Sequence, residues 1–294
     1  MNTKTVEPSI VVNLNKKIIK AQDAKISIFD RGFLFGDSIY EVSYAFEGKV
    51  LFLDDHLQRL YNSATLLKIN IDFTIDEIKE EINKTLQSIS EPLIYIRIII
   101  TRGESKISLA PQADLKNNFI IIAKPLELPP KKFYEDGIKL MTSTYIRNSI
   151  QSVDPNAKSG NYLNNIMAIQ EAKNYDYDDA IMLNHDNLVT EGTTFNIFCI
   201  KDDQIITPSL ESGLLKGITR QKIIELCHRE KFDLKLSALT LEELKGADEV
   251  FITSSTRGVM PVSKIDKQNF PKSIAKNSKT YSIRKLYLDL IKNS

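Results

Sequence analysis

Lys158 lies in the segment "DPNAKSGNYLNN" (154–165), where its neighbours are small residues and amides. Lysine side chains are mostly exposed, so the ordinary interpretation is a solvated loop residue. The alternative is a nucleophilic amine in a tight loop that a carbonyl compound can approach. Tyr162, four residues later, is either a core aromatic residue at a helix start or a phenol that bonds a cofactor oxygen.

Glu191 is the second residue with two interpretations. It lies in "VTEGTTFNIF" (189–198), between two strand-like stretches and directly before a glycine. It is either an acid in a hairpin turn or a carboxylate that holds a proton on a heterocyclic nitrogen.

Three further segments have the chemistry of an anion site. The residues Gly217-Ile218-Thr219 open a helix, whose free N–H groups and dipole attract anions. Ser254, Ser255 and Thr256 place three hydroxyls after a strand, and Arg59 follows His56 by one helical turn. Each segment has an ordinary explanation as a turn, a cap or a surface residue. Together they could bind a phosphate, but the sequence does not bring them together.

The elements that must position these residues follow from periodicity and turn chemistry. Alternation predicts strands, and apolar residues at helical spacing predict amphipathic helices. Asp54 or Asp55 is the expected cap of the first long helix, and Thr74 of the second. The predicted strands and hairpins are 9–20, 39–53, 93–103, 117–126, 138–147, 179–208 and 249–265, and the predicted helices are 54–69, 74–89, 162–176, 217–232 and 240–247.

The chain divides at a segment rich in proline. "KPLELPPKKFYEDG" (124–137) contains three prolines and is the best linker candidate. We therefore predict an α+β protein of two domains. The first is a small N-terminal α+β domain (1–124), the linker is 125–136, and the C-terminal domain (137–294) contains Lys158.

Composition excludes several classes of protein. The chain has 294 residues, 42% hydrophobic and 26% charged, with a net charge of +1, so neither disorder nor a nucleic-acid partner is expected. Apolar runs are too short to span a membrane, and the N-terminus lacks a signal-peptide pattern. Two cysteines without metal-ligand spacing and three scattered histidines predict reduced thiols, no metal site and a cytoplasmic location.

The motifs resemble those of one family, the class IV (fold-type IV) pyridoxal-phosphate enzymes. That family includes branched-chain and D-amino-acid aminotransferases, aminodeoxychorismate lyases and (R)-amine transaminases. Seven stretches match in the family's order over nearly the whole chain: "DRGFLFGDSIYE" (30–41), "DDHLQRL" (54–60), "YIRIIITRG" (95–103), "AKSGNYLNNIMA" (157–168), "TEGTTFNIF" (190–198), "LLKGITR" (214–220) and "FITSSTRGVMPV" (251–262).

The resemblance implies a role for each candidate residue. Lys158 is the catalytic residue and forms the Schiff base with pyridoxal 5'-phosphate. Glu191 pairs with the pyridine nitrogen, and Tyr162 bonds the phenolic oxygen. The phosphate is held by Arg59, the amides of Ile218 and Thr219, and Ser255, with Thr256 beside it. On the substrate side the implied residues are Tyr40, Arg97 and Arg257.

The resemblance also implies the fold and the reaction. The expected fold is that of a two-domain fold-type IV enzyme, with a small α/β N-terminal domain and a larger domain with a β-barrel-like core. The expected reaction moves the amino group of an aliphatic, branched-chain amino acid to 2-oxoglutarate by a ping-pong mechanism. The expected partners are a small amino acid, a 2-oxo acid and a second copy of the chain, as a homodimer or a higher homo-oligomer.

Where the motifs depart from one subgroup, alternatives stay open. "YEVSYAF" (40–46) is more similar to D-amino-acid aminotransferases and (R)-amine transaminases, whereas "YIR" (95–97) matches branched-chain enzymes. The loop "GESKISLAPQ" (103–112) lacks the Arg-x-His pair of the familiar D-amino-acid enzymes. Arg257 is either a carboxylate anchor or a surface charge. The alternatives are a D-amino-acid aminotransferase with a non-standard carboxylate site, an aminodeoxychorismate lyase, and a pyridoxal-phosphate-binding protein without turnover.

Overall fold

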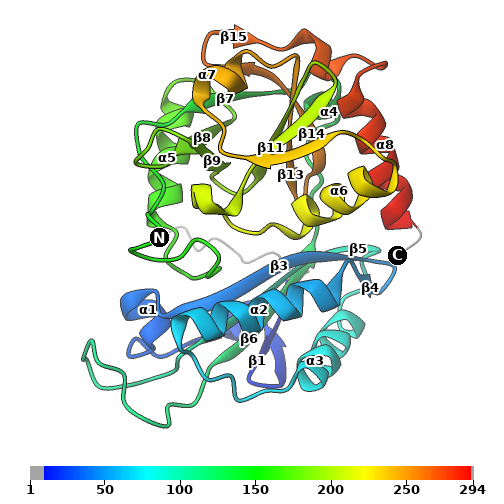
Figure 1. Cartoon of the computed structure of the whole chain (residues 1–294). Coiled ribbons are helices and arrows are strands. Elements are labelled where there is room, and N and C mark those ends of the chain that lie inside the picture. Colours follow the sequence, from blue (N-terminus) through cyan, green and yellow to red (C-terminus); the bar gives the residue numbers. More distant parts are fainter. Residues whose placement is uncertain (1–9, 293–294) are drawn as a thin grey trace. The chain divides into compact units, whose positions relative to one another are not determined.

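The computed structural model describes residues 10–292, and these form two compact units. The first unit contains residues up to Glu127 together with the short segment Ala157–Asn161. The second contains Leu128–Asn156 and the chain from Tyr162 onward. Lys158 therefore belongs to the first unit, although the residues on both sides of its segment belong to the second. Figure 1 labels the helices and strands of both units and colours them along the sequence.

The first unit is built on a six-stranded antiparallel sheet with the strand order β2-β1-β6-β5-β3-β4. The turn at Glu47-Gly48 joins β3 to β4, inside the segment 39–53 that the sequence assigns to strands and hairpins. The elements of this unit are β1 (Val11–Leu14), β2 (Lys17–Lys20), a 3-10 turn (Ala21–Asp23), α1 (Arg31–Phe35), β3 (Ser38–Phe46), β4 (Lys49–Val50), α2 (Leu53–Leu67), α3 (Ile75–Gln87), β5 (Leu93–Thr101) and β6 (Phe119–Pro125).

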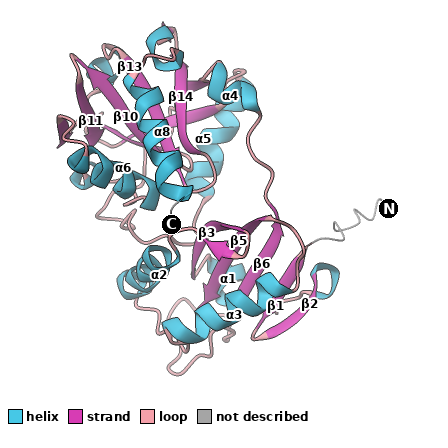
Figure 2. Ribbon diagram, turned by 90° about the vertical axis from the view of Figure 1, so that its right-hand side faces the viewer, coloured by secondary structure: helices cyan, strands magenta, loops and turns pink. Residues whose placement is uncertain are grey.

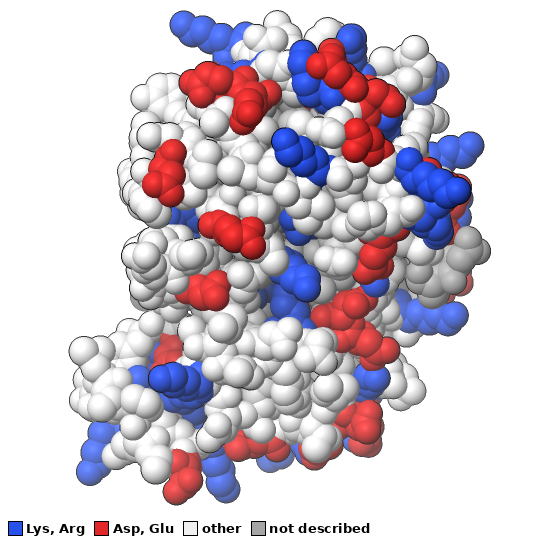
Figure 3. Space-filling model, in the orientation of Figure 1, with Lys and Arg blue, Asp and Glu red and all other residues white. Residues whose placement is uncertain are grey.

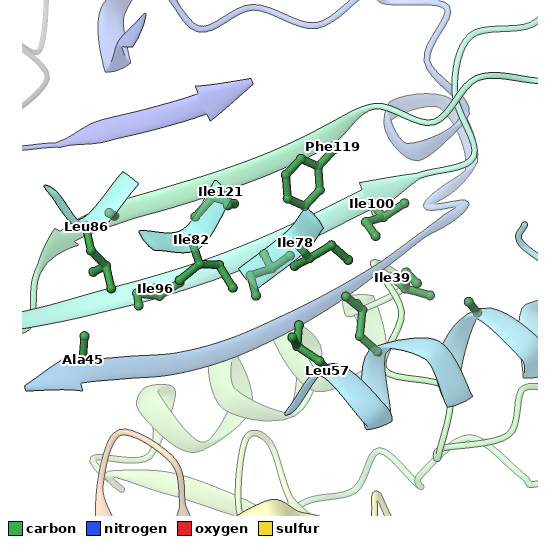
Figure 4. Packing of buried hydrophobic residues seen from close by; sticks show 14 of the residues in the cluster. Ile39, Ala45, Leu57, Ile78, Ile82, Leu86, Ile96, Ile100, Phe119 and Ile121 are labelled. Carbon is green, nitrogen blue, oxygen red and sulfur yellow. The ribbon is translucent and has the colours of Figure 1, made fainter. Parts of the chain in front are cut away.

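Helices α2 and α3 cover one face of this sheet. Every second residue of β5 points to these helices, and the buried side chains on this side of the strand are all isoleucine (Figure 4). Each isoleucine that is fully removed from water contributes roughly 1.5–3 kcal/mol. The core residues supplied by the helices and strands are Ile39, Ala45, Leu57, Leu60, Ala64, Ile78, Ile82, Leu86, Ile94, Ile96, Ile98, Ile100, Phe119, Ile121 and Ala123.

The two helices begin differently from each other. Thr74 caps α3 with a full capping box, in which its hydroxyl and the Glu77 carboxylate exchange bonds with the backbone, as the sequence predicts. The prediction that Asp54 or Asp55 caps α2 is wrong. The N-cap residue is Phe52, in a left-handed conformation with no side-chain cap bond. The two aspartates lie inside the first turn, where their charge favours the helix dipole.

The second unit contains a larger, mixed sheet that curls into a half-barrel. Its strand order is β12-β11-β10-β13-β14-β7-β8-β9, with β15 paired to β14. The pairs β7·β8, β7·β14 and β11·β12 are parallel and the others are antiparallel. The strands are β7 (Ile138–Thr142), β8 (Asp179–Leu183), β9 (Val189–Gly192), β10 (Asn196–Lys201), β11 (Gln204–Pro208), β12 (Leu234–Ser237), β13 (Glu249–Ser254), β14 (Gly258–Ile265) and β15 (Gln268–Asn269).

Helices accompany this sheet, as Figure 2 shows in cyan. The α5 helix packs along β8, and its alanines Ala168 and Ala172 allow a close approach. Both cysteines are buried and free of disulfides. The helices are α4 (Lys131–Glu135), α5 (Leu163–Asn174), α6 (Ile218–Arg229), α7 (Leu241–Lys245) and α8 (Lys279–Lys292), with 3-10 turns at Leu210–Ser212 and Pro271–Ile274.

Acidic and basic side chains are interspersed on the face shown in Figure 3. None of the helices within residues 10–292 is both long and apolar enough to cross a membrane.

Candidate active site

The segment that carries Lys158 pairs with β3 in the first unit. The Tyr40 N–H donates to the Lys158 carbonyl at 3.0 Å, and the Gly160 N–H donates to the Ser38 carbonyl at 2.9 Å. The Lys158 N–H donates to Ser63 Oγ on α2, also at 3.0 Å. The backbone of Lys158 is thus held at its N–H and at its carbonyl. The loop that carries this residue is therefore tightly fixed.

The amine of Lys158 lies against Tyr40. Its Nζ is 3.2 Å from the Tyr40 hydroxyl and 4.4 Å from the centre of the ring. The guanidinium of Arg97, from the neighbouring strand β5, lies 4.2 Å from the same ring centre. Among the described residues the side chain of Arg97 has no hydrogen bond or ion pair. Contact with an aromatic ring stabilises a cation only modestly, so this guanidinium retains its capacity to bind an anion.

Arg59 is held by a buried carboxylate on the helix side of β3. Its Nε and Nη2 donate to the two oxygens of Glu41 at 2.6 and 2.7 Å, and His56 Nδ1 lies 2.7 Å from Glu41 Oε2. Burial alone would raise the pKa of Glu41, but the charge and hydrogen bonds of Arg59, with those of His56, lower it to about 2. The predicted shared face of His56 and Arg59 is confirmed, whereas their common partner was not predicted.

Glu191 lies inside β9 and is 5% exposed, so the hairpin-turn interpretation is wrong. Arg147 Nε donates to Glu191 Oε1 at 3.0 Å, and the Leu215 N–H donates to Oε2 at 3.1 Å. Asn196 Nδ2 lies 3.4 Å from the same Oε2 and donates to the Leu215 carbonyl at 2.9 Å. The carboxylate is therefore fixed in direction by donors from three parts of the second unit.

The same contacts reach the start of α6. Asn196 Oδ1 approaches Gly217 so closely that a Cβ there would lie 2.0 Å from it. Gly217 is the N-cap residue, and α6 begins without a side-chain cap, so the Ile218 and Thr219 N–H groups are not capped by a side chain of residues 10–292. Arg220 is fully buried. Burial lowers its pKa to about 10, although the charge of Glu191 opposes that shift.

The remaining predicted residues also belong to the second unit. Tyr162 is the N-cap residue of α5. Ser255 and Thr256 form the turn between β13 and β14, next to Ser254, whose buried hydroxyl has no hydrogen-bond partner among the described residues. Arg257, for which the sequence left open a carboxylate anchor or a surface charge, forms an ion pair with Asp179 at 3.2 Å.

The structure thus groups the predicted residues in two sets. Tyr40, Arg59, Arg97 and Lys158 belong to the first unit, and the other seven belong to the second. Sequence reasoning missed the charged residues that hold them, namely Glu41, Arg147 and Asp179. Glu41 follows Tyr40 in a matching motif and could have been noticed there. Arg147 and Asp179 have no local signal, because their partners are far away in the chain.

Comparison with known proteins identifies the family. The family model described as "Amino-transferase class IV" matches residues 38–265. The chain belongs to this family. A D-alanine aminotransferase of Bacillus licheniformis is 33% identical over 92% of this chain and 94% of its own length. A Methanocaldococcus jannaschii protein, provisionally named a branched-chain-amino-acid aminotransferase, is 37% identical over 87% of this chain and 88% of its own length.

Solved structures agree with this assignment. The branched-chain amino acid aminotransferase of Escherichia coli superposes with a TM-score of 0.91 at 27% identity, covering 96% of this chain and 94% of the other. A T.th. branched-chain amino acid aminotransferase, solved with pyridoxamine 5'-phosphate, gives 0.90 at 27% identity, with the same coverage of both chains. The predicted family, the fold-type IV architecture and an aminotransferase activity are confirmed. Class IV aminotransferases use pyridoxal phosphate, which confirms the predicted cofactor.

Proposed function

We propose that this aminotransferase moves the amino group of an aliphatic, branched-chain amino acid to 2-oxoglutarate in a ping-pong cycle. The observation that carries the proposal is the Arg97 guanidinium, which has no hydrogen bond or ion pair among the described residues and shares the Tyr40 ring with the Lys158 amine. A carboxylate of the substrate would supply the missing partner of Arg97.

The strand face that carries Tyr40 and Arg97 supports both kinds of substrate. Alternation along β3 and β5 puts Val42, Tyr95 and Ile99 on this face, and all three are partly exposed. Apolar side chains beside the Arg97 guanidinium suit an aliphatic side chain in one half-reaction and a second carboxylate in the other. This is the pattern that a branched-chain donor and a 2-oxoglutarate acceptor require.

The residues present fit the cofactor by their chemistry. Lys158 supplies a primary amine beside a hydroxyl, and Glu191 supplies a buried carboxylate with a fixed direction. The uncapped start of α6 supplies N–H groups that could bind a phosphate. Arg59 supplies a guanidinium that is held in place by Glu41. When bound, pyridoxal phosphate supplies an electron sink that makes the α-proton of an amino acid labile.

The proposed roles follow from these chemistries. Lys158 Nζ would hold the cofactor, and its free amine would act as the base that takes the α-proton of the donor and gives it back. Glu191 keeps a proton on the ring nitrogen, and Tyr162 bonds the phenolic oxygen. The phosphate is bound by Arg59, the Ile218 and Thr219 N–H groups and Ser255, with Thr256 beside it. Tyr40 orients the Lys158 amine, and Arg97 binds a substrate carboxylate.

The visible spectrum of the purified protein tests the proposal. We expect a yellow protein whose absorbance bleaches with L-leucine and returns with 2-oxoglutarate, while D-alanine has no effect. An Arg97→Met variant should bind the cofactor normally and lose at least tenfold in kcat/KM for 2-oxoglutarate, whereas Arg284→Met, in α8, serves as the control. A protein that stays colourless with added pyridoxal phosphate would contradict the proposal.

A D-amino-acid aminotransferase is the second candidate. The 33% identity to a D-alanine aminotransferase over nearly the whole chain supports it. Bleaching with D-alanine and not with L-leucine would select it. Pyruvate release from aminodeoxychorismate would instead select a lyase.

We also propose a homodimer and a cytoplasmic location. The first turns of α5 expose Leu163 (70%) and Ile166 (43%), and the loop before it exposes Ile146 (55%) and Ile150 (50%). Large apolar side chains grouped on a surface are typical of an interface between protein chains, and a second copy would remove them from water.

A further inference from the structure

The guanidinium of Arg257 already has partners within the second unit. Its Nη1 lies 3.2 Å from Asp179 Oδ2, and its Nη2 donates to Thr194 Oγ1 at 2.5 Å. The guanidinium also lies over the Phe195 ring, 5.5 Å from its centre. The side chain of Arg257 is 24% exposed, whereas that of Asp179 is only 3% exposed. Arg257 is thus the counter-charge of a buried carboxylate.

Both oxygens of the Asp179 carboxylate have partners. Its Oδ1 accepts from the Thr193 hydroxyl at 2.5 Å and from the Ala180 N–H at 2.9 Å. If Arg257 turned away to bind a substrate carboxylate, the buried Asp179 would lose its only ion pair among the described residues. Leaving a buried charge uncompensated is strongly unfavourable, so the geometry opposes such a movement.

The ion pair joins a turn that carries proposed cofactor contacts to a turn that directly follows another, Glu191. Thr193 to Phe195 directly follow Glu191 and Gly192, and this turn is packed tightly, since a Cβ on Gly192 would lie 1.9 Å from the Phe195 ring. Asn165 of α5 donates to the Thr193 carbonyl at 2.8 Å.

At the other end, Arg257 completes the turn that begins with Ser255 and Thr256. The Tyr134 hydroxyl donates to its carbonyl at 2.9 Å. The backbone of Arg257 is therefore fixed in the 255–257 turn, and its guanidinium is fixed to the 193–195 turn.

We propose that Arg257 is a positioning residue: with Asp179 it locks the 255–257 turn to the 193–195 turn, and it does not bind the substrate carboxylate. The inference rests on the proposed function only for the roles of Glu191, Ser255 and Thr256 toward the cofactor. It implies that recognition of the donor carboxylate does not depend on the Arg257 guanidinium.

Substitutions at both ends of the ion pair test this inference. The proteins to compare are the wild type, Arg257→Met, Arg257→Lys, Asp179→Asn, the double variant Arg257→Met/Asp179→Asn, and the control Arg229→Met, which removes an exposed arginine of the same unit. The measurements are the dissociation constant of pyridoxal phosphate, the midpoint of thermal unfolding without cofactor, and KM for the amino donor at saturating cofactor.

A positioning role predicts a specific combination of results. Arg257→Met should raise the dissociation constant of pyridoxal phosphate at least fivefold and change KM for the donor less than twofold. Arg257→Lys should recover at least half of the lost affinity. The double variant should unfold no earlier than Arg257→Met, because the neutral amide that replaces the Asp179 carboxylate needs no counter-charge, and Arg229→Met should match the wild type.

Two results would overturn the inference. One is a KM for the donor raised tenfold or more in Arg257→Met with unchanged cofactor affinity, which is the signature of a carboxylate anchor. The other is additive losses of thermal stability in the double variant, which would show that the two side chains act independently. The thermal comparison uses the protein without cofactor, so it decides the inference even if the wild type fails to bind pyridoxal phosphate and the proposed function falls.

Discussion

At the scale of single residues, three of the candidate side chains are directed by a charged partner that takes no direct part in the proposed chemistry. Glu41 holds Arg59, Arg147 holds Glu191, and Asp179 holds Arg257. All three partners are at least partly removed from water, where a charge–charge contact depends strongly on geometry. The direction of these functional groups is therefore set by ion pairs.

Arg147 provides the first prediction at this scale. Replacing it by Gln removes a positive charge 3.0 Å from Glu191 and should lower the free energy of unfolding by about 3 kcal/mol. The more negative surroundings favour protonated forms, so the pH at which the absorbance of the bound cofactor changes should move upward. Denaturant titration and a pH series of spectra measure both. Arg229→Gln is the control, and an unchanged spectral midpoint would contradict the proposed closeness of Glu191 to the cofactor ring.

Glu41 gives a prediction about acid stability. Its pKa in the folded protein is about 2, below the ordinary value of 4.5, so its contribution is complete above pH 4.5 and is lost as the pH falls towards 2. A shift of this size corresponds to about 3 kcal/mol. Glu41→Gln should be less stable than the wild type at pH 7 and should lose less further stability between pH 4.5 and 2.

Denaturant titrations at several pH values check this, with the exposed Glu91→Gln as the matched control. Parallel curves for the wild type and Glu41→Gln over this pH range would show that Glu41 is not the group that titrates.

At the scale of elements, the start of α6 depends on one glycine. A Cβ on Gly217 would lie 2.0 Å from Asn196 Oδ1, and Asn196 also contacts Glu191 and Leu215. Gly217→Ala should therefore displace Asn196, destabilise the protein by about 2 kcal/mol and weaken binding of pyridoxal phosphate severalfold.

Thermal unfolding and cofactor titration measure these two effects. Gly246→Ala, where the nearest atom to the new Cβ is 3.3 Å away, should be close to wild type. If Gly217→Ala behaves like this control, the close approach of Asn196 to Gly217 is needed neither for stability nor for binding of pyridoxal phosphate.

The elements also show what sequence can predict. Helices α2 and α3 begin within one residue of their predicted starts and end two residues before their predicted ends, because long amphipathic patterns and the Thr74 capping box are local signals. The short helix α1 and strand β12 lack such a pattern and were not predicted, and the C-terminal segment with α8 was not assigned. Lys158 and Glu191 stood out by their motifs. Their partners did not, because Arg147 lies 44 positions from Glu191 in the chain and only the folded sheet brings them together.

At the scale of the whole molecule, we expect two chains in the active form. One chain has a mass of 33.4 kDa, so light scattering coupled to size exclusion should give about 67 kDa, twice that value. Leu163→Glu, on the exposed apolar surface of α5, should shift the mass towards one chain and lower the activity. The exposed Leu236→Glu is the control. A single-chain mass for a fully active wild type would contradict the dimer.

The membership of residues 157–161 in the first unit has a consequence for how the protein is made. The ribosome releases residues 1–127 first, and the part of β3 that pairs with Ser159 must wait until residues 128–156 have also been synthesised. A fragment that stops at Glu127 would contain Tyr40, Arg59 and Arg97 but neither the lysine nor the backbone that covers this strand. A short synthetic peptide spanning Ala157–Asn161 is the natural complement of such a fragment. The N-terminal unit therefore cannot be completed until residues 128–156, which belong to the second unit, and residues 157–161 have been synthesised.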